Sequence, residues 1–458
     1  MVMSLNSNQF KRNIWRRLLQ LDQAAPVRTE TEVTAEAERN YPWNFTVNLL
    51  DGVIFWFGLN MVSGSTIIPL FVSKLTDNTL IIGLIAVVAQ ASWYLPQILT
   101  ASFIEKLARK KPVVVNLGFF TERLPVWLWP AACLLIPFSP GLALFIFFLG
   151  YAWHGIGAGA IAPAWQDLIA RCFPTHRRGR FFGITTFIGT GVGAIGALLS
   201  SWLLEVYAFP LNFTFIFLVG AAAITISWGF LALTREPVQL PAGPAPSPIW
   251  SRLRQIIRQD HNFRRFLQAR FLLALGTMGL AFVTVAAVQR LNVSDGTVGF
   301  YTVALLIGQT IGSLLAGWFA DHVGHKLSLE AAGGVGFAAF GLAWLAPAEQ
   351  WYYLIFILLG MAIGSTVVSG LMITLEFSSP EQRPTYIGIA NTVVGIGSSI
   401  APLVGGWLAG LNYAWLFGLS ALLNLGALAA MRWFVSDPRW QPVGGARPDV
   451  PDDGLAAN

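Results

Sequence analysis

About twelve apolar segments, each long enough to cross a lipid bilayer, constrain this chain more than any other feature of its sequence. A bilayer core of ~30 Å requires about 20 apolar residues in a helix. The predicted spans are 45–72, 79–103, 113–136, 140–166, 181–205, 211–233, 266–289, 297–320, 327–346, 351–376, 385–409 and 412–435. The sequence therefore predicts an all-α polytopic membrane protein with twelve transmembrane helices.

The composition excludes other classes of protein. Hydrophobic residues make up 55% of the 458 residues and charged residues 11%, whereas soluble domains carry about 25% charged residues. Too little polar surface remains for a soluble, disordered or nucleic-acid-binding protein. Cys133 and Cys172 fall near opposite faces of the membrane and cannot pair, and no cluster of residues has the spacing of a metal site.

The basic residues predict the orientation of the chain in the membrane. Four basic clusters fall on one side of a twelve-helix count, whereas the opposite loops hold only Lys74 and Arg290. These clusters lie at 11–17, 106–111, 177–180 and 252–265. Cytoplasmic loops carry an excess of Lys and Arg. We therefore expect a multi-pass protein of the cell membrane with both termini in the cytoplasm.

Two segments outside the spans have the amphipathic spacing of helices that lie on a membrane surface. The first includes Phe10, Ile14 and Leu18, and its alternative is a disordered basic tail. The second, Ile249–Gln259, follows a proline-rich spacer. The predicted organisation is a cytoplasmic tail (1–43), an N-terminal six-helix bundle (44–234), a cytoplasmic linker (235–262), a C-terminal six-helix bundle (263–436) and a cytoplasmic tail (437–458).

The two predicted bundles align with each other. An offset of 216 residues places helix 2 on helix 8, and an offset of 205 places helix 5 on helix 11. The aligned pairs include Glu105 with Asp321, Lys110 with Lys326 and Arg178 with Arg383. Since charges of the same sign coincide at the ends of helices, duplication of a six-helix unit is the economical account.

The segment Gly317–Lys326, GWFADHVGHK, resembles the signature loop of the major facilitator superfamily, G-x-x-x-D-x-x-G-R-K. His325 replaces a basic residue of that motif. The first-half counterpart at 101–110 keeps Glu105 and Lys110 but lacks both glycines. The resemblance implies two pseudo-symmetric six-helix bundles around a central cavity.

Helix 11 resembles the antiporter motif of the same superfamily, G-x8-G-x3-G-P-x2-G-G. The matching residues are Gly388, Gly397, Pro402, Gly405 and Gly406, with Ala401 in place of a glycine. Helix 5, where antiporters of the superfamily carry this motif, lacks it. The resemblance suggests export by antiport.

Charged residues at the helix ends are candidates for a gate, because ion pairs there can break as two bundles separate. Asp167 and Arg171 share a helical face at four-residue spacing and should pair, with Glu376 and Arg383 in the equivalent role. Asp321 can accept hydrogen bonds from a helix N-terminus or pair with an arginine. The gating and motif candidates are Glu105, Lys110, Asp167, Arg171, Arg178, Gly317, Asp321, Gly324, Lys326, Glu376, Arg383, Pro402, Gly405 and Gly406.

Charged residues within the spans require an explanation, because each costs about 2.5–3.5 kcal/mol at mid-helix. Glu122 lies ~15 Å deep at 1.5 Å per residue. Its neighbour Arg123 points in another direction, so each side chain should find a partner on another helix or in the cavity. The two alternatives are a coupling role in the cavity and a structural ion pair between helices.

Asp51, His154 and Arg270 are the other proton-coupling or substrate candidates. Burial disfavours the charged form of a carboxyl group, so Asp51 could bind and release a proton. Its alternative role is that of a shallow structural acid. His154 occupies the Gln position of a motif that resembles the superfamily's R-x-x-Q-G-x-G, and its alternative is a packing role. Arg270 either extends to the cytoplasmic interface or is the counter-ion of Asp51 or of an anionic substrate.

Polar and aromatic side chains elsewhere could line a cavity for an amphipathic or weakly charged organic solute. The candidates are Asn60, Gln90, Trp93, Tyr94, Gln97, Gln309, Asn391 and Asn424.

The sequence thus predicts a secondary active transporter that moves a small organic solute by alternating access, coupled to protons and directed to efflux. The alternatives are a proton symporter or uniporter for uptake, a membrane sensor and a lipid scramblase. We expect no enzymatic activity, no cofactor and no nucleic-acid partner, since the chain contains no phosphate-binding loop and no catalytic triad. The expected partners are a small-molecule substrate and the bilayer, with the chain acting as a monomer.

Overall fold

The computed structural model describes residues 16–21, 23, 26, 28–238, 249–378 and 383–440. Within these ranges the chain is helical and has no strands. Ten of the described helices are long and apolar enough to cross a membrane. The helix α2 (Glu30–Met61) and the broken helix at 113–135 supply the other two crossings, so the predicted fold class is confirmed. Most of the predicted surface helix at 10–19, the proline-rich spacer from 239 and the tail from 441 lie outside the described residues.

The first predicted span, 45–72, is not one continuous helix. A capping box starts α2, since the Thr29 hydroxyl accepts from the N–H of Glu32 and the Glu32 carboxylate accepts from the N–H of Thr29. The helix ends at Met61, and α3 (Ile67–Ser73) continues the crossing. The sequence between them is Val-Ser-Gly-Ser-Thr, and Ser and Thr side chains compete with helical backbone hydrogen bonds.

The third crossing departs from α-helical geometry. It contains two π-helical segments, η1 (Val113–Leu117) and η2 (Phe119–Arg123), followed by the 3-10 turn η3 (Pro125–Trp127) and by α5 (Leu128–Leu135). Pro125 has no N–H and its ring would clash with the carbonyl four residues earlier. The widened turn accommodates it, and the N–H of Leu124 donates to the carbonyl of Phe119 at 2.8 Å. π-bulges within helices occur often at functional sites.

The remaining helices form two groups. The first half of the molecule contains α2 to α8 and the second half contains α10 to α16. The bounds are α4 (Thr79–Glu105), α6 (Pro140–Cys172), α7 (Thr175–Val206), α8 (Leu211–Ala232), α9 (Ile249–Gln259), α10 (His261–Leu275), η4 (Gly276–Gly279), α11 (Leu280–Leu291), α12 (Asp295–His322), α13 (His325–Leu345), α14 (Gln350–Glu376), α15 (Arg383–Leu411), α16 (Tyr413–Phe434) and η5 (Pro438–Trp440). The helix predicted at 249–259 is therefore present as α9.

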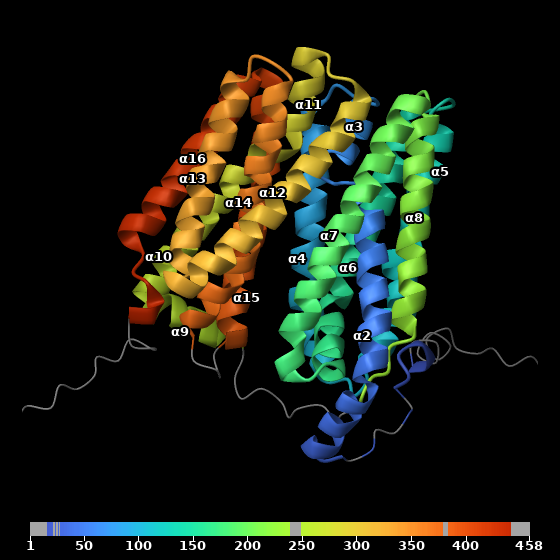
Figure 1. Cartoon of the computed structure of the whole chain (residues 1–458), viewed down its shortest axis with the longest axis vertical. Helices are drawn as coiled ribbons and strands as arrows, with labels where there is room; N and C mark the ends of the chain where they lie inside the picture. Colours follow the sequence, from blue (N-terminus) through green and yellow to red (C-terminus); the bar gives the residue numbers. More distant parts are fainter. Residues whose placement is uncertain are drawn as a thin grey trace, which may run out of the picture.

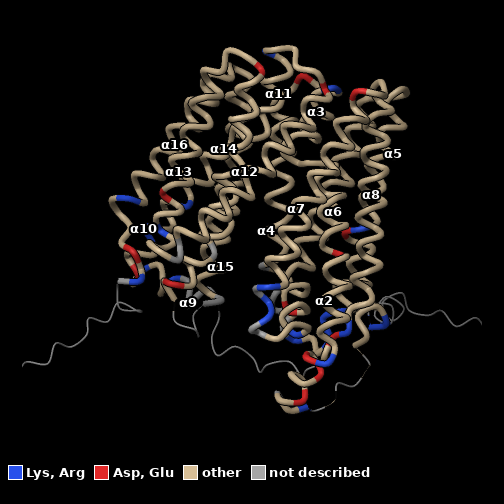
Figure 2. The backbone as a smooth tube through the Cα atoms, in the orientation of Figure 1, with Lys and Arg blue, Asp and Glu red and all other residues tan. Residues whose placement is uncertain are grey.

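The charged residues gather mainly at one end of the molecule, where Figure 2 shows their positions at the lower ends of the helices. We call this the basic end, defined by the segments 106–111, 177–180 and 254–265, and we call the other the opposite end. At the basic end the two halves diverge (Figure 1).

The two halves meet toward the opposite end. There α4 packs against α15, and α7 packs against α12. The polar contacts between the halves are the Lys74–Asp295 ion pair at 2.7 Å, the Thr66 and Thr302 hydroxyls at 2.5 Å, the Ser201 hydroxyl on the Gly296 carbonyl at 2.5 Å and the Thr284 hydroxyl on the Ser65 carbonyl at 3.3 Å. The described conformation is therefore held together at the opposite end.

Candidate functional site

A cavity of about 580 Å³ lies inside the first half of the molecule, among α2, α4, η2, α5, α6 and α7. Four of the five predicted proton-coupling or substrate candidates line it, namely Asp51, Glu122, Arg123 and His154. Its aromatic lining consists of Phe55, Trp56, Trp93, Trp129, Tyr151, Trp165, Phe181 and Phe182. A pocket of this kind, largely apolar with a few convergent polar groups, is typical of a small-molecule site.

Asp51 projects from α2 into this cavity and is only 7% exposed. The Arg123 guanidinium favours its charged form, whereas the Glu122 carboxylate disfavours it. Oδ1 of Asp51 is buried and has no hydrogen-bond partner among the described residues. A buried carboxylate is costly unless its charge is compensated, so this group is suited to hold a proton or to meet a ligand.

Glu122 and Arg123 form an ion pair with each other, with 2.8 Å between Oε1 and Nη1. Both side chains lie in the cavity wall, as one predicted alternative had it, but the other alternative, an ion pair between helices, was wrong. It assumed α-helical geometry, whereas both residues lie in the π-helical turn η2. The Arg123 guanidinium also lies over the Phe55 ring at 4.9 Å. The pair is thus buried within the cavity wall.

His154 connects α6 to this turn. Its Nδ1 lies 2.8 Å from the carbonyl oxygen of Glu122, and because a carbonyl only accepts, Nδ1 carries the hydrogen. The second nitrogen is then left as the acceptor in the neutral ring. The close approach of the two backbones depends on Gly157, since a Cβ at that position would overlap the carbonyl oxygen of Thr121. His154 therefore helps to position η2 against α6.

Several polar atoms in the cavity wall lack partners. Besides Oδ1 of Asp51, they include Nε of Arg123, Oγ1 of Thr185 and Nε1 of Trp129, each without a hydrogen bond to any other described residue. Buried polar groups are nearly always satisfied by protein, water or ligand. Sequence reasoning missed Thr185 and Trp129, because hydroxyl and aromatic residues are frequent throughout the spans and carry no distinguishing signal.

The buried Glu122–Arg123 ion pair should affect the stability of the protein. Glu122→Gln or Arg123→Gln alone should lower the free energy of unfolding by about 3–5 kcal/mol, because each leaves an uncompensated buried charge. The double variant should lose less than the sum of the two single losses. Thermal unfolding of the purified variants in detergent measures this coupling. Strictly additive losses would show that the two charges do not compensate each other.

Arg270 lies apart from this cavity. It is 9% exposed, so the predicted extension to the membrane interface was wrong. Its guanidinium packs on Gly370 of α14 and faces Tyr94 of α4, in the other half. No carboxylate of the described residues forms an ion pair with it, and its Nε has no hydrogen-bond partner there. Arg270 is therefore a separate buried cation rather than the counter-ion of Asp51.

The predicted cavity-lining residues lie in different parts of the structure. Trp93 lines the cavity. Asn60 and Gln97 donate instead to carbonyls of their own helices, each at 2.8 Å. Asn391 is exposed, and Gln90 and Gln309 are partly buried outside the cavity wall. Asn424 lies inside the second half, where it donates to the Gly276 carbonyl at 3.0 Å and thus joins α16 to η4.

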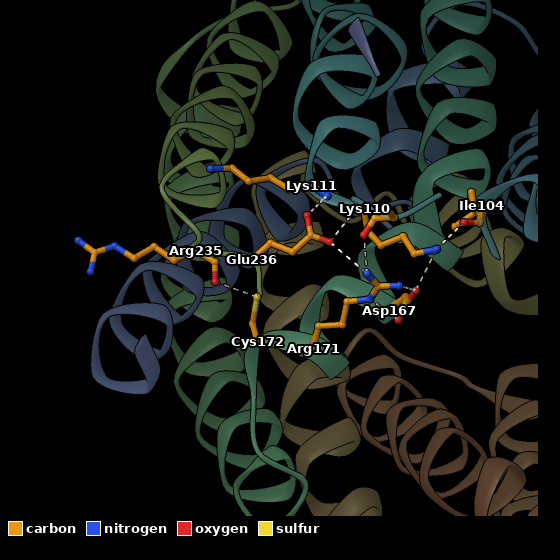
Figure 3. A network of polar contacts seen from close by, with 9 residues as sticks. Ile104, Lys110, Lys111, Asp167, Arg171, Cys172, Arg235 and Glu236 are labelled. Carbon is orange, nitrogen blue, oxygen red and sulfur yellow. Dashed lines mark hydrogen bonds and ion pairs between the residues drawn. The ribbon is translucent and has the colours of Figure 1, made fainter. Parts of the chain in front are cut away.

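A charge network joins the loop before the third crossing to the end of α6 (Figure 3). Arg171 bonds Asp167 through two contacts of 3.2 and 3.1 Å and donates to the Ala108 carbonyl at 2.8 Å. The Lys110 ammonium is almost fully buried, lies 3.2 Å from Asp167 and also donates to the Ile104 carbonyl. The predicted Asp167–Arg171 pair is thus present, and it holds the adjoining loop.

The other gating candidates occupy varied positions. Arg178 donates to the carbonyls of Phe173 and Ala170 at the end of α6. Lys326 pairs with Glu330 at 3.2 Å. Glu376 leaves Oε2 without a hydrogen-bond partner among described residues. The side chains of Glu105, Asp321 and Arg383 lie outside the described residues.

The glycine and proline residues of the two motifs in the second half lie mostly at packing contacts. Gly324 has φ +115° and packs on the Arg439 guanidinium, whereas Gly317 has open space around it. The helix 11 motif residues Pro402 and Gly406 contact Gly83 and Thr79 of the first half, and Gly405 contacts Met278. The antiporter-type motif thus lies partly in the contact between the halves.

Comparison with known proteins agrees with this geometry. The family model described as Major Facilitator Superfamily matches residues 266–453. The uncharacterised MFS-type transporter YfkF of Bacillus subtilis is 23% identical over 338 residues, which cover 69% of this chain and 77% of that protein. The gentisate transporter of Corynebacterium glutamicum is 29% identical over 171 residues, or 36% of this chain and 38% of that protein. The multidrug resistance protein MdtH of Photorhabdus laumondii is 20% identical over 295 residues, or 62% and 71%.

Solved structures share the fold. The crystal structure of a D-xylose-proton symporter has a TM-score of 0.65 at 15% identity and covers 87% of this chain and 99% of its own. A bacterial homologue of the iron transporter ferroportin, in an inward-facing state, has a TM-score of 0.62 at 12% identity, with 88% and 99% covered.

The two bundles of apolar helices have the fold of solved membrane transporters, and a largely apolar cavity with a few polar groups lies inside the first bundle. The second half of the chain matches the family model of the major facilitator superfamily, and the chain as a whole has the fold of the solved transporters.

Proposed function

We propose that this protein moves a small amphipathic organic solute across the cell membrane by alternating access, driven by a proton gradient, with Asp51 as the proton-binding residue. The observation that carries this proposal is the buried Asp51 carboxyl group with its unpartnered Oδ1 in the aromatic cavity. The cavity wall contains two carboxyl groups, of Asp51 and Glu122, and one guanidinium, of Arg123. One proton balances the charge, so protonation and solute binding are linked in the same space.

The solute class follows from the lining. Aromatic rings offer stacking surfaces for an unsaturated or amphipathic molecule, and a volume of about 580 Å³ suits a small organic compound. Outside this cavity, Arg270 is a buried cation without a carboxylate partner in the described part of the chain, which favours a solute that carries an acidic group. Gentisate, an aromatic carboxylate named for one relative, is therefore a suitable first test solute.

The proposed domain organisation, membrane orientation and oligomeric state are those predicted from the sequence. The bundles at 44–234 and 263–436 are the moving bodies, the basic end lies in the cytoplasm because of its Lys and Arg excess, and one chain is the working unit. We take export by antiport as the direction. The helix 11 motif and the name of the MdtH relative support it.

Flux into proteoliposomes tests the proposal. Purified protein is reconstituted, and uptake of radiolabelled gentisate and of a panel of amphipathic cations and acids is measured with the pH gradient imposed in either direction. We expect accumulation of at least one solute that depends on the gradient and collapses with a protonophore. Flux that is indifferent to the gradient would identify a uniporter instead, and its dependence on gradient direction distinguishes export from uptake.

A further inference from the structure

A second cavity, of about 320 Å³, lies at the basic end of the first half and shares no lining residue with the cavity around Asp51. It lies between the start of the third crossing and the segment that follows α8. Arg109, Lys111, Asn116, Arg235 and Glu236 contribute to its wall, together with Gln20 of the N-terminal segment. The wall is thus polar and contains three cations and one acid.

The one acid in this wall, Glu236, already accepts hydrogen bonds from the protein. The two carboxylate oxygens of Glu236 accept from the backbone N–H groups of Lys110 at 2.7 Å and Lys111 at 2.9 Å, and Arg171 lies at 3.7 Å. Burial raises the pKa of Glu236, which further reduces its repulsion of an anion. The cavity therefore keeps a positive balance.

Two cations of the wall have no carboxylate partner, and the third, Arg235, lies over the Trp43 ring at 4.6 Å, a contact that leaves its N–H groups free of a carboxylate. Neither Arg109 nor Lys111 forms an ion pair with a carboxylate of the described residues, and Nε of Arg109 is buried there without a hydrogen-bond partner. In Figure 3 the side chains of Lys111 and Arg235 extend to the same side, away from Glu236. Burial lowers the pKa of Lys111, so a bound anion would stabilise its ammonium form.

The N-terminal segment closes one side of this cavity. Asn116 Nδ2 donates to the Leu18 carbonyl at 2.8 Å, and Leu19 is buried in the same apolar cluster as Val113 and Val114. The cavity therefore has a defined wall that includes residues far apart in the sequence, rather than being an open surface patch.

We propose that this cavity binds a phosphate group, with the headgroup of an anionic phospholipid as the source that its place at the end of the membrane-spanning helices favours. Arg and Lys side chains are the usual partners of phosphate, and basic pockets between membrane helices bind anionic headgroups. The site is separate from the cavity around Asp51, and this proposal does not depend on the proposed function.

Thermal unfolding of the purified full-length protein in detergent tests the site. Phosphatidylglycerol, phosphatidylcholine and inorganic phosphate are titrated separately, and the apparent affinity is taken from the rise in melting temperature. We expect phosphatidylglycerol to raise the melting temperature more than phosphatidylcholine. Lys111→Gln and Arg235→Gln should each weaken its apparent affinity about five-fold, since each basic residue near an anionic headgroup contributes in that range.

Arg258→Gln is the matched control, because Arg258 is an exposed arginine of α9 at the same end of the molecule but outside the cavity. It should bind as the wild type does. Native mass spectrometry of retained lipid gives a second measurement that does not depend on melting. A full effect from inorganic phosphate would identify the source as a soluble phosphate. Equal stabilisation by both lipids, or unchanged phosphatidylglycerol affinity in the Lys111→Gln/Arg235→Gln variant, would overturn the proposal.

Discussion

Asp51→Asn should abolish gradient-driven accumulation of the solute while leaving solute exchange at equal pH intact. At one proton per solute molecule, each pH unit supports about ten-fold accumulation, because a ten-fold concentration ratio corresponds to about 1.4 kcal/mol. The amide keeps the size of the carboxyl group but cannot carry the proton. In proteoliposomes with a gradient of two pH units, the accumulation ratio should fall from about 100 to about 1.

Two comparisons make this prediction specific. Asp77→Asn removes an exposed carboxylate from the loop before α4 and should accumulate solute like the wild type. Glu122→Gln should reduce stability through its lost ion pair with Arg123. Retained accumulation in Asp51→Asn, with loss in Glu122→Gln, would move the proton site to Glu122 on the neighbouring wall.

The number and order of the crossings could be predicted because bilayer thickness fixes the length of an apolar segment. The breaks within crossings could not. The interruption after Met61 and the π-helical turn before Pro125 depend on backbone hydrogen bonding, which hydropathy does not measure. The start of α2 at Glu30, well before the predicted span, follows from its capping box rather than from apolar residues.

The cavity was only partly predictable for a related reason. A charged or titratable residue within an apolar span stands out in the sequence because such residues are rare there. Asp51, Glu122, Arg123 and His154 could therefore be predicted as site residues. Their meeting in one half, rather than between the halves, depends on tertiary packing. The Glu122–Arg123 pair in particular needed the π-helical geometry of η2. Aromatic residues such as Trp129 gave no signal because most aromatic side chains in such a chain face lipid or pack.

The second large effect is expected at Gly83, where α4 meets α15 in the contact between the halves. A Cβ at this position would lie 2.5 Å from the carbonyl oxygen of Pro402, and backbone cannot move aside as a flexible side chain can. Gly83→Val should therefore separate the halves at the opposite end. Overpacking costs about 1–3 kcal/mol, which changes the ratio of two conformations by about 5–150-fold.

Thr302→Cys reports this opening, because Thr302 is buried in the same contact against Thr66, while the native Cys133 and Cys172 are themselves buried. Its labelling by a membrane-impermeant maleimide should be slow in the parent protein and about ten-fold faster or more after Gly83→Val. Gly418→Val serves as the control, since a Cβ there meets nothing within 4 Å. If the halves formed one rigid body, the same clash would lower the melting temperature without faster labelling. Faster labelling with little loss of stability is expected only if the two halves already exchange between a conformation that is closed at the opposite end and one that is open there.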